Sequence, residues 1–119
     1  MLHRLLLIGC ALGAAAMSPA IPSALAAEPY IGRWAADPAR CGSFGGNNPA
    51  TVTLVATDSG LNWFSGYCRI GKMYKLGQAF YIQARCSDGG DIPVTLDPRG
   101  DRMKVSWNRG KPAEMHRCK

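Results

Sequence analysis

The chain has 119 residues, of which 47% are hydrophobic and 18% are charged. Its 14 Lys and Arg residues outnumber its 8 Asp and Glu residues, which gives a formal net charge of +6. This length excludes a multidomain protein, and the scattered charges, without a recognised binding motif, argue against a nucleic-acid-binding protein. The positive charge suits either simple solubility or an anionic partner, such as an envelope polyanion or an acidic protein face.

The N-terminal residues 1–26 have the pattern of a secretory signal peptide. Arg4 precedes an apolar run from Leu5 to Met17, and Ala24 to Ala26 fits the small-residue cleavage rule. A run of about 13 residues is too short to span a bilayer. We therefore expect cleavage after Ala26, a single domain at residues 27–119, no transmembrane segment after processing, and a periplasmic or secreted location. Cys10 resembles the cysteine of a bacterial lipoprotein box, which leaves lipidation as an alternative.

Short segments in which apolar and polar residues alternate predict eight strands in the remaining chain. In chain order they are Tyr30–Trp34, Thr51–Val55, Leu61–Phe64, Tyr67–Lys75, Ala79–Cys86, Ile92–Leu96, Arg102–Trp107 and Ala113–Cys118. Asp, Asn, Gly and Pro residues between most of them are typical of tight turns. The one longer loop, Ala36–Ala50, has room for a helical turn near Asp37–Cys41. Gly71, inside the fourth segment, predicts a bulge or a bend.

Sequential strands joined by short loops predict an antiparallel meander, and closing the meander into a barrel removes its two exposed edges. We therefore predict an all-β fold, a small eight-stranded antiparallel up-and-down barrel stapled by two disulfides. Strands this short leave an interior filled mostly by side chains, which favours a surface or loop site over a central cavity.

Four cysteines remain after the predicted cleavage, and an even number in a small exported domain is typical of two disulfides. Their spacing is too wide for the paired cysteines of a zinc site or for a C-x-x-C redox motif. Cys68 and Cys86 fall nearly opposite each other about a turn centred on Gly77. Of the three pairings that four cysteines allow, we therefore predict Cys68–Cys86 with Cys41–Cys118.

The sequence offers little that points to catalysis. His116 is the only histidine left after cleavage, so no second histidine supports a metal site. No cysteine is free as a nucleophile if both disulfides form. The acidic residues Asp88, Asp91, Asp97 and Asp101 cluster around turns, where Asp is common for conformational reasons. We expect no enzymatic activity, no metal ion and no cofactor.

Gly32, Trp34 and Arg117 carry a resemblance to a known group of folds. A Gly-x-Trp on the first strand, with an Arg late in the last strand, resembles the calycin pattern of lipocalins and their small relatives. This resemblance implies that Trp34 packs across one end of the barrel beneath the Arg117 guanidinium, in a cation–π contact. The order of Trp34, the DPARC segment and the later cysteines also resembles small exported proteins of alphaproteobacteria.

In size, the domain resembles the periplasmic inhibitor barrels of Gram-negative bacteria, which implies a protein-binding role. The metalloprotease inhibitors of that group insert a free N-terminal arm into the protease, whereas here only Ala27–Ile31 precede Gly32. The positive charge also disfavours a basic lysozyme as partner. We expect a non-catalytic, inhibitor-like protein-binding module. A binder of a small ligand or envelope polyanion, and a structural envelope protein without a discrete ligand, are the alternatives.

Aromatic and basic residues on the predicted Tyr67–Cys86 hairpin form the candidate partner-binding surface. The residues are Arg69, Lys75, Tyr81 and Arg85. We expect them to share the face that points away from the core, provided that Gly71 leaves the alternation intact. Tyr and Arg are the residue types that most often anchor protein interfaces. Phe44, in the Gly-rich loop, is a competing apolar anchor, and a solvated strand face with no partner is the plain alternative.

Overall fold

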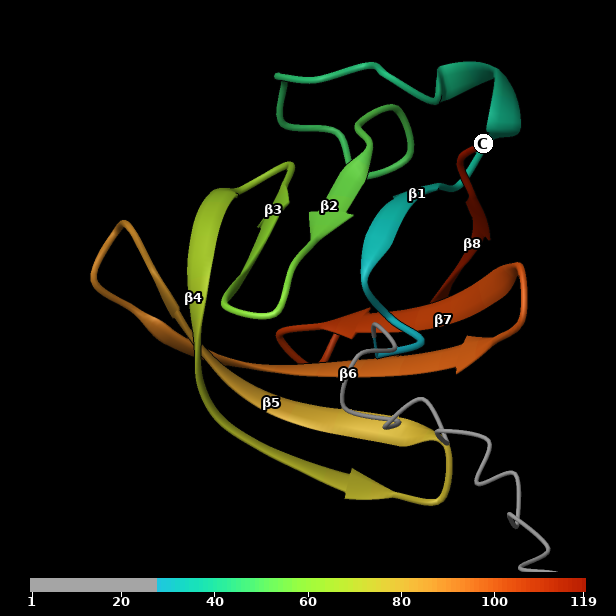
Figure 1. Cartoon of the computed structure of the whole chain (residues 1–119). Helices are drawn as coiled ribbons and strands as arrows, with labels where there is room; N and C mark the ends of the chain where they lie inside the picture. The colour runs from blue at the N-terminus through green and yellow to red at the C-terminus, as the bar shows by residue number, and fades with distance from the viewer. Residues whose placement is uncertain (1–27) are drawn as a thin grey trace, which may run out of the picture.

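The computed structural model describes residues 28–119, so the predicted signal peptide and Cys10 lie outside the described residues. Each of eight antiparallel strands pairs with the next along the chain, and the first pairs with the last to close a barrel (Figure 1). The elements are β1 (Gly32–Ala35), the 3₁₀ turn η2 (Pro38–Arg40), β2 (Leu54–Ala56), β3 (Gly60–Trp63), β4 (Gly66–Leu76), β5 (Ala79–Cys86), β6 (Asp91–Arg99), β7 (Arg102–Trp107) and β8 (Ala113–Arg117). The predicted barrel is confirmed, and so are the predicted disulfides Cys41–Cys118 and Cys68–Cys86.

The core of the protein is the inner face of the strands. On β5 the alternation is clean: Phe80, Ile82 and Ala84 are buried, whereas Gln83 and Arg85 between them are exposed. Successive side chains of a strand point to opposite faces, so the period of two in the sequence becomes an inside and an outside of the barrel.

The second strand begins later than its sequence pattern predicts. The structure starts β2 at Leu54 rather than Thr51. The backbone N–H of Thr53 donates to the Ser43 carbonyl at 2.8 Å, and its hydroxyl donates to the Arg40 carbonyl at 3.0 Å. These bonds tie the residues before Leu54 to the long loop, which contains the predicted helical turn as η2.

The sixth strand is longer than predicted. It extends to Arg99, beyond the predicted end at Leu96, although Pro98 cannot donate a backbone hydrogen bond. The pairing of β6 with β5 ends at Leu96, so Pro98 has no neighbour on that side and its missing N–H removes no ladder bond.

The barrel closes where β1 meets β8, and Trp34 lies at this closure. Its side chain is completely buried, and its indole Nε1–H donates to the Tyr30 carbonyl at 2.9 Å. The Arg117 guanidinium carbon lies 4.2 Å from the centre of the Trp34 ring. The same guanidinium donates from Nη1 to the Ile31 carbonyl at 3.0 Å and from Nη2 to the Pro29 carbonyl at 2.8 Å. One arginine therefore ties the residues before β1 to the last strand.

Gly32 makes this approach sterically feasible. Its φ is +142°, and a Cβ atom there would lie 2.7 Å from Nη1 of Arg117. Beside it, the Cys41–Cys118 disulfide joins the loop after β1 to the residue that follows β8. We call Gly32, Trp34, Cys41, Arg117 and Cys118 the closure cluster.

The predicted bulge in β4 lies at Gly71. The register against β5 shifts between Ile70 and Lys72, and a Cβ atom at Gly71 would lie 2.8 Å from the Gln83 carbonyl oxygen. A larger residue would push the two strands apart, so the close approach explains the glycine. On its other side, β4 pairs with β3 only as far as Arg69.

Candidate functional site

The bulge at Gly71 changes which β4 residues face outward. Arg69 pairs with Arg85 on the outside of the barrel, but beyond the bulge Lys75 pairs with Phe80, whose side chain is buried. The expectation that Arg69 and Lys75 share one face is therefore wrong. The extra residue at the bulge shifts the alternation by one position, which turns every later side chain to the opposite face.

Tyr74, which the sequence analysis missed, takes the outward position that was expected for Lys75. It pairs with Tyr81, and the two rings stack with their centroids 5.2 Å apart and an angle of 12° between their planes. Tyr74 is 60% exposed. The Lys75 ammonium instead lies 5.3 Å from the centre of the Phe80 ring. The signal that would have revealed Tyr74 is Gly71 itself, once read as a bulge that resets the alternation.

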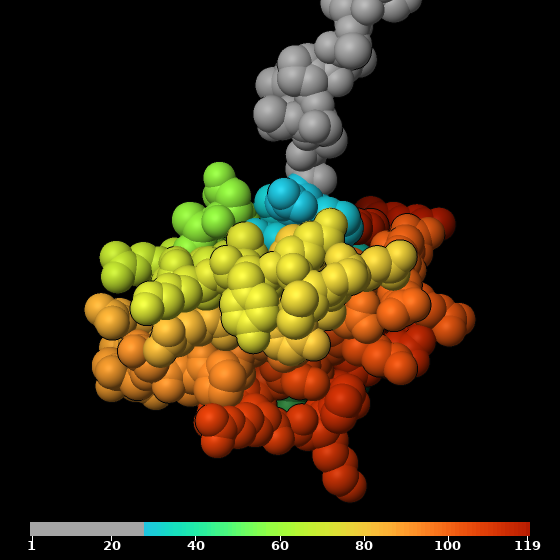
Figure 2. All heavy atoms as spheres, turned by 90° about the horizontal axis from the view of Figure 1, so that it is seen from below, coloured from blue at the N-terminus to red at the C-terminus, as the bar shows by residue number. Residues whose placement is uncertain are grey.

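The outward residues of this hairpin form a continuous surface, which we call the hairpin face. They are Arg69, Lys72, Tyr74, Tyr81, Gln83 and Arg85. Four of them, with Ile92, Pro93, Thr95 and Arg109 among their neighbours, line a groove of about 480 Å³ between the hairpin and β6. In Figure 2 the yellow atoms of the hairpin occupy the middle of the side of the barrel that is viewed.

The hairpin is strongly basic. Residues 66–86 contain four basic side chains, Arg69, Lys72, Lys75 and Arg85, and no Asp or Glu. Arg85 donates from Nε to the carboxylate of Asp91 on β6 at 3.1 Å, and both side chains remain largely exposed. An exposed pair of this kind contributes little to stability, and the surface around it stays positive.

Phe44 belongs to a separate site at the long loop. It is 61% exposed and lines a pocket of about 350 Å³ together with Trp63 and Phe64, among others. The rings of Trp63 and Phe64 meet edge to face at 4.8 Å, and Trp63 meets Trp107 in the same manner at 5.3 Å. None of the hairpin-face residues lines this pocket, so the two candidate sites that the sequence suggested are distinct.

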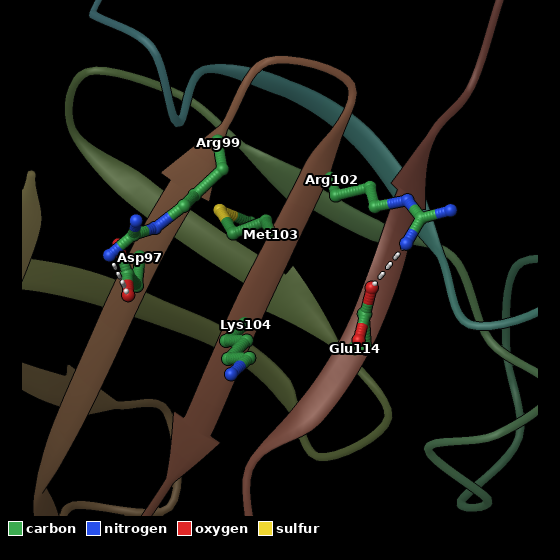
Figure 3. A pocket seen from close by; sticks show the side chains of 6 residues that line it. All are labelled: Asp97, Arg99, Arg102, Met103, Lys104 and Glu114. Carbon is green, nitrogen blue, oxygen red and sulfur yellow. Dashed lines mark hydrogen bonds and ion pairs between the residues drawn. The ribbon is translucent and has the colours of Figure 1, made fainter.

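A third concave surface lies across the outer side of β6, β7 and β8 (Figure 3), with a volume of about 340 Å³. Its charges largely pair with one another. Arg99 bonds Asp97 at 3.4 Å, and Arg102 bonds Glu114 at 3.2 Å. These pairs leave Lys104 as the charged side chain of this surface with no such bond among residues 28–119. A surface with its charges balanced internally offers less to an ionic partner than the hairpin does.

The described part of the chain contains no group of three or more His, Cys, Asp or Glu side chains placed to hold a metal ion. The cysteines of residues 28–119 are all bonded in disulfides. Burial, aided by the nearby carboxylates of Glu28 and Asp58, raises the pKa of Tyr30. Its ring packs edge to face on Phe80 at 4.8 Å, so Tyr30 is a buried structural residue.

Comparisons with protein-family models, with curated proteins and with solved structures gave no match to this chain. Within residues 28–119, no helix is long and apolar enough to cross a membrane. Two disulfides are consistent with an oxidising, exported location.

Proposed function

We propose that this protein is an exported, non-catalytic binding protein, an inhibitor-like module that recognises another protein through the hairpin face. The observation that carries this proposal is the exposed Tyr74 ring stacked on the half-buried Tyr81 ring among basic side chains, beside a groove of about 480 Å³. Tyrosine and arginine are enriched at the energetic centres of protein interfaces, and the tyrosine ring buries a large area at a low entropy cost.

The chemistry of the hairpin also indicates the type of partner. Four basic groups and no acidic one on residues 66–86 favour an acidic protein face, which positive charge would steer into contact. The Cys41–Cys118 and Cys68–Cys86 disulfides support a periplasmic or secreted setting for this encounter. The contact of Arg117 with the Trp34 ring supports the calycin-like assignment, in which the barrel is a rigid scaffold.

The test is a binding experiment with the processed protein, residues 27–119, as bait for the periplasmic and secreted proteins of its own cells. Once a partner is captured and purified, Tyr81→Ala combined with Arg85→Ala should weaken binding by at least about 2 kcal/mol, and added salt should weaken it further. Arg99→Ala, which removes a basic residue from the far β6–β8 surface, is the matched control and should change affinity little.

The competing outcome is equally specific. If the double variant binds as tightly as the wild type while Phe44→Ala does not bind, the loop pocket is the site and the hairpin face is not.

The aromatic pocket beside Phe44 favours a second candidate function, the binding of a small ligand. Its aromatic walls and its volume of about 350 Å³ suit part of a ring-shaped or apolar molecule. A thermal-shift screen against envelope components, run on the wild type and on Phe44→Ala, separates this function from protein binding. Stabilisation by an envelope polyanion that needs Lys72 and Arg69 would instead favour an anionic envelope ligand. No partner and no ligand in either experiment would favour a purely structural envelope protein.

A further inference from the structure

Half of β4 has a neighbouring strand on one side only. β4 pairs with β3 from Gly66 to Arg69, and the last backbone bond on that side runs from the Ile70 N–H to the Ser59 carbonyl at 2.9 Å. From the bulge to Leu76, no strand among residues 28–119 pairs with this side of β4. Figure 1 shows the end of β4 at the margin of the barrel with only β5 alongside. We call the outer side of residues 72–76 the free edge.

The hairpin turn determines which backbone groups lie on the free edge. Leu76 pairs with Ala79 across the two-residue turn Gly77–Gln78, so this pair is the hydrogen-bonded one. Hydrogen-bonded and non-hydrogen-bonded pairs alternate along an antiparallel ladder. Met73 and Lys75 are therefore non-hydrogen-bonded positions, and their N–H and C=O groups point away from β5.

Apolar side chains are concentrated along the same edge. Met73 is 41% exposed, Tyr74 60% and Leu76 61%, and these three are most of the large exposed hydrophobic residues in the described chain. An edge with unpaired backbone groups and exposed apolar side chains is a template for one more strand. A strand added here would cover Tyr74 and Leu76 on one face and Met73 on the other.

The charge of the edge decides what kind of strand fits. A second copy of this chain, pairing β4 with β4, would bring Lys72 and Lys75 close to the same lysines of the partner, and like charges across strands are destabilising. Carboxylates three residues apart on an added strand, one on each face, would instead meet Lys72 and Lys75. We propose that the free edge accepts an extended acidic segment of the partner protein as an added β-strand.

This inference rests on the proposed protein-binding function and names the mode of binding and the chemistry of the partner. The backbone groups of Met73 and Lys75 supply sequence-independent hydrogen bonds, and the lysines and Tyr74 supply preference among peptides. The bulge at Gly71 contributes to the hydrogen bonds and to the peptide preference, because it turns Tyr74 outward and lies where the pairing of β4 with β3 ends.

The experiment uses the processed protein, residues 27–119, and a fluorescent eight-residue synthetic peptide of valine and threonine with two glutamates three residues apart, one on each face of the strand. We expect a dissociation constant below about 1 mM by anisotropy at low salt, typical of a short added strand. In NMR spectra, the largest amide shifts should fall on Met73 and Lys75. The same peptide with lysine in place of glutamate should bind at least about tenfold more weakly.

Two changes test the backbone pairing itself. Lys75→Pro removes an N–H that points to the free edge, so it breaks no bond to β5, and Pro is tolerated at edge positions. This variant should weaken binding of the peptide at least about tenfold. Lys75→Thr removes the charge but keeps the N–H, so it should cost only about two- to threefold. Circular dichroism establishes that each variant is folded. If the proline variant fails to fold, the wild type is tested with a peptide whose alternate amides are N-methylated, which should not bind.

Three results would overturn the inference. One is that the wild-type protein does not bind the acidic peptide, which would mean that the lysines protect the edge from pairing. Another is equal binding of the N-methylated peptide. The third is that the wild type is a dimer by light scattering and Lys75→Pro is a monomer, which would mean that a second copy of the chain occupies the free edge. A natural partner whose binding needs Tyr81 and Arg85 but tolerates Lys75→Pro would retain the proposed function and refute only the added strand.

Discussion

The closure cluster and the tip of the β4–β5 hairpin differ in both backbone pairing and burial. Between β1 and β8 only two residue pairs are in register, Trp34 with Arg117 and Ala35 with His116. The hairpin has eight pairs, all local in sequence, and a two-residue turn. Yet Trp34 is fully buried, whereas Tyr74 on the hairpin is 60% exposed.

A small barrel needs reinforcement where its first and last strands meet, rather than within a local hairpin. Joining the first strand to the last closes a long loop of chain, and two backbone pairs offset little of the entropy that this closure costs. The disulfide, the cation–π contact and the guanidinium bonds to two carbonyls supplement that short seam. The hairpin forms from local contacts and needs no such help, so its outer face and edge are free to carry a binding surface.

The largest loss of stability is expected when the covalent link at the closure is removed. Replacing Cys41 and Cys118 together by serine should cost about 4.5 kcal/mol by the loop-entropy relation, because the bridge spans 77 residues. Replacing Cys68 and Cys86, a bridge of 18 residues within the hairpin, should cost about 3 kcal/mol. Urea unfolding of both double variants measures the order, and a reversed order would contradict the contrast between closure and hairpin.

The aromatic core of the closure should matter nearly as much. Trp34→Ala should destabilise the fold by about 3–5 kcal/mol, because it leaves a large cavity and removes the surface on which Arg117 packs. Tyr74→Ala, an aromatic truncation at an exposed hairpin position, is the control and should cost about 1 kcal/mol or less. Similar losses for the two variants in thermal or chemical unfolding would show that the hairpin tip is as structural as the closure.

A smaller loss of stability is expected from changes at Arg117. Arg117→Ala should cost about 1–2 kcal/mol through the lost stacking and packing on Trp34. Arg117→Lys should recover only part of this loss, since an ammonium cannot donate to the Ile31 and Pro29 carbonyls in the fixed geometry of the guanidinium. Full recovery by lysine would mean that charge alone, rather than planar stacking, holds the seam.

The smallest effect is expected at high pH. Burial raises the pKa of Tyr30 in the folded state, so the unfolded chain releases this proton first as the pH rises. The stability contributed by neutral Tyr30 is fully present below a pH of about 10 and is lost as the pH rises through the folded pKa. Tyr30→Phe should flatten this alkaline slope in unfolding titrations, and an unchanged slope in that variant would contradict this role of Tyr30.

The sequence predicted most of the local structure correctly. Alternation on Ala79–Cys86 and Arg102–Trp107 matches β5 and β7 residue for residue. The turn about Gly77 predicted the Cys68–Cys86 pair, and Asp37 begins the helical turn where its side chain accepts from the Ala39 N–H. The largest failures were the start of β2, the end of β6 and the face of Lys75, each of which depends on a neighbour distant in the chain or on the bulge.

The number of strands, their inner faces and the two disulfides could be predicted from the sequence, because periodicity, turn residues and cysteine count are local or additive properties. Three further features are visible only in the folded barrel. β4 extends beyond β3, Gly71 turns Tyr74 rather than Lys75 outward, and Met73 and Lys75 present backbone groups to an open edge. Those features arise from how far one strand extends beside another. That extent is a property of pairs of segments, which no single stretch of sequence encodes.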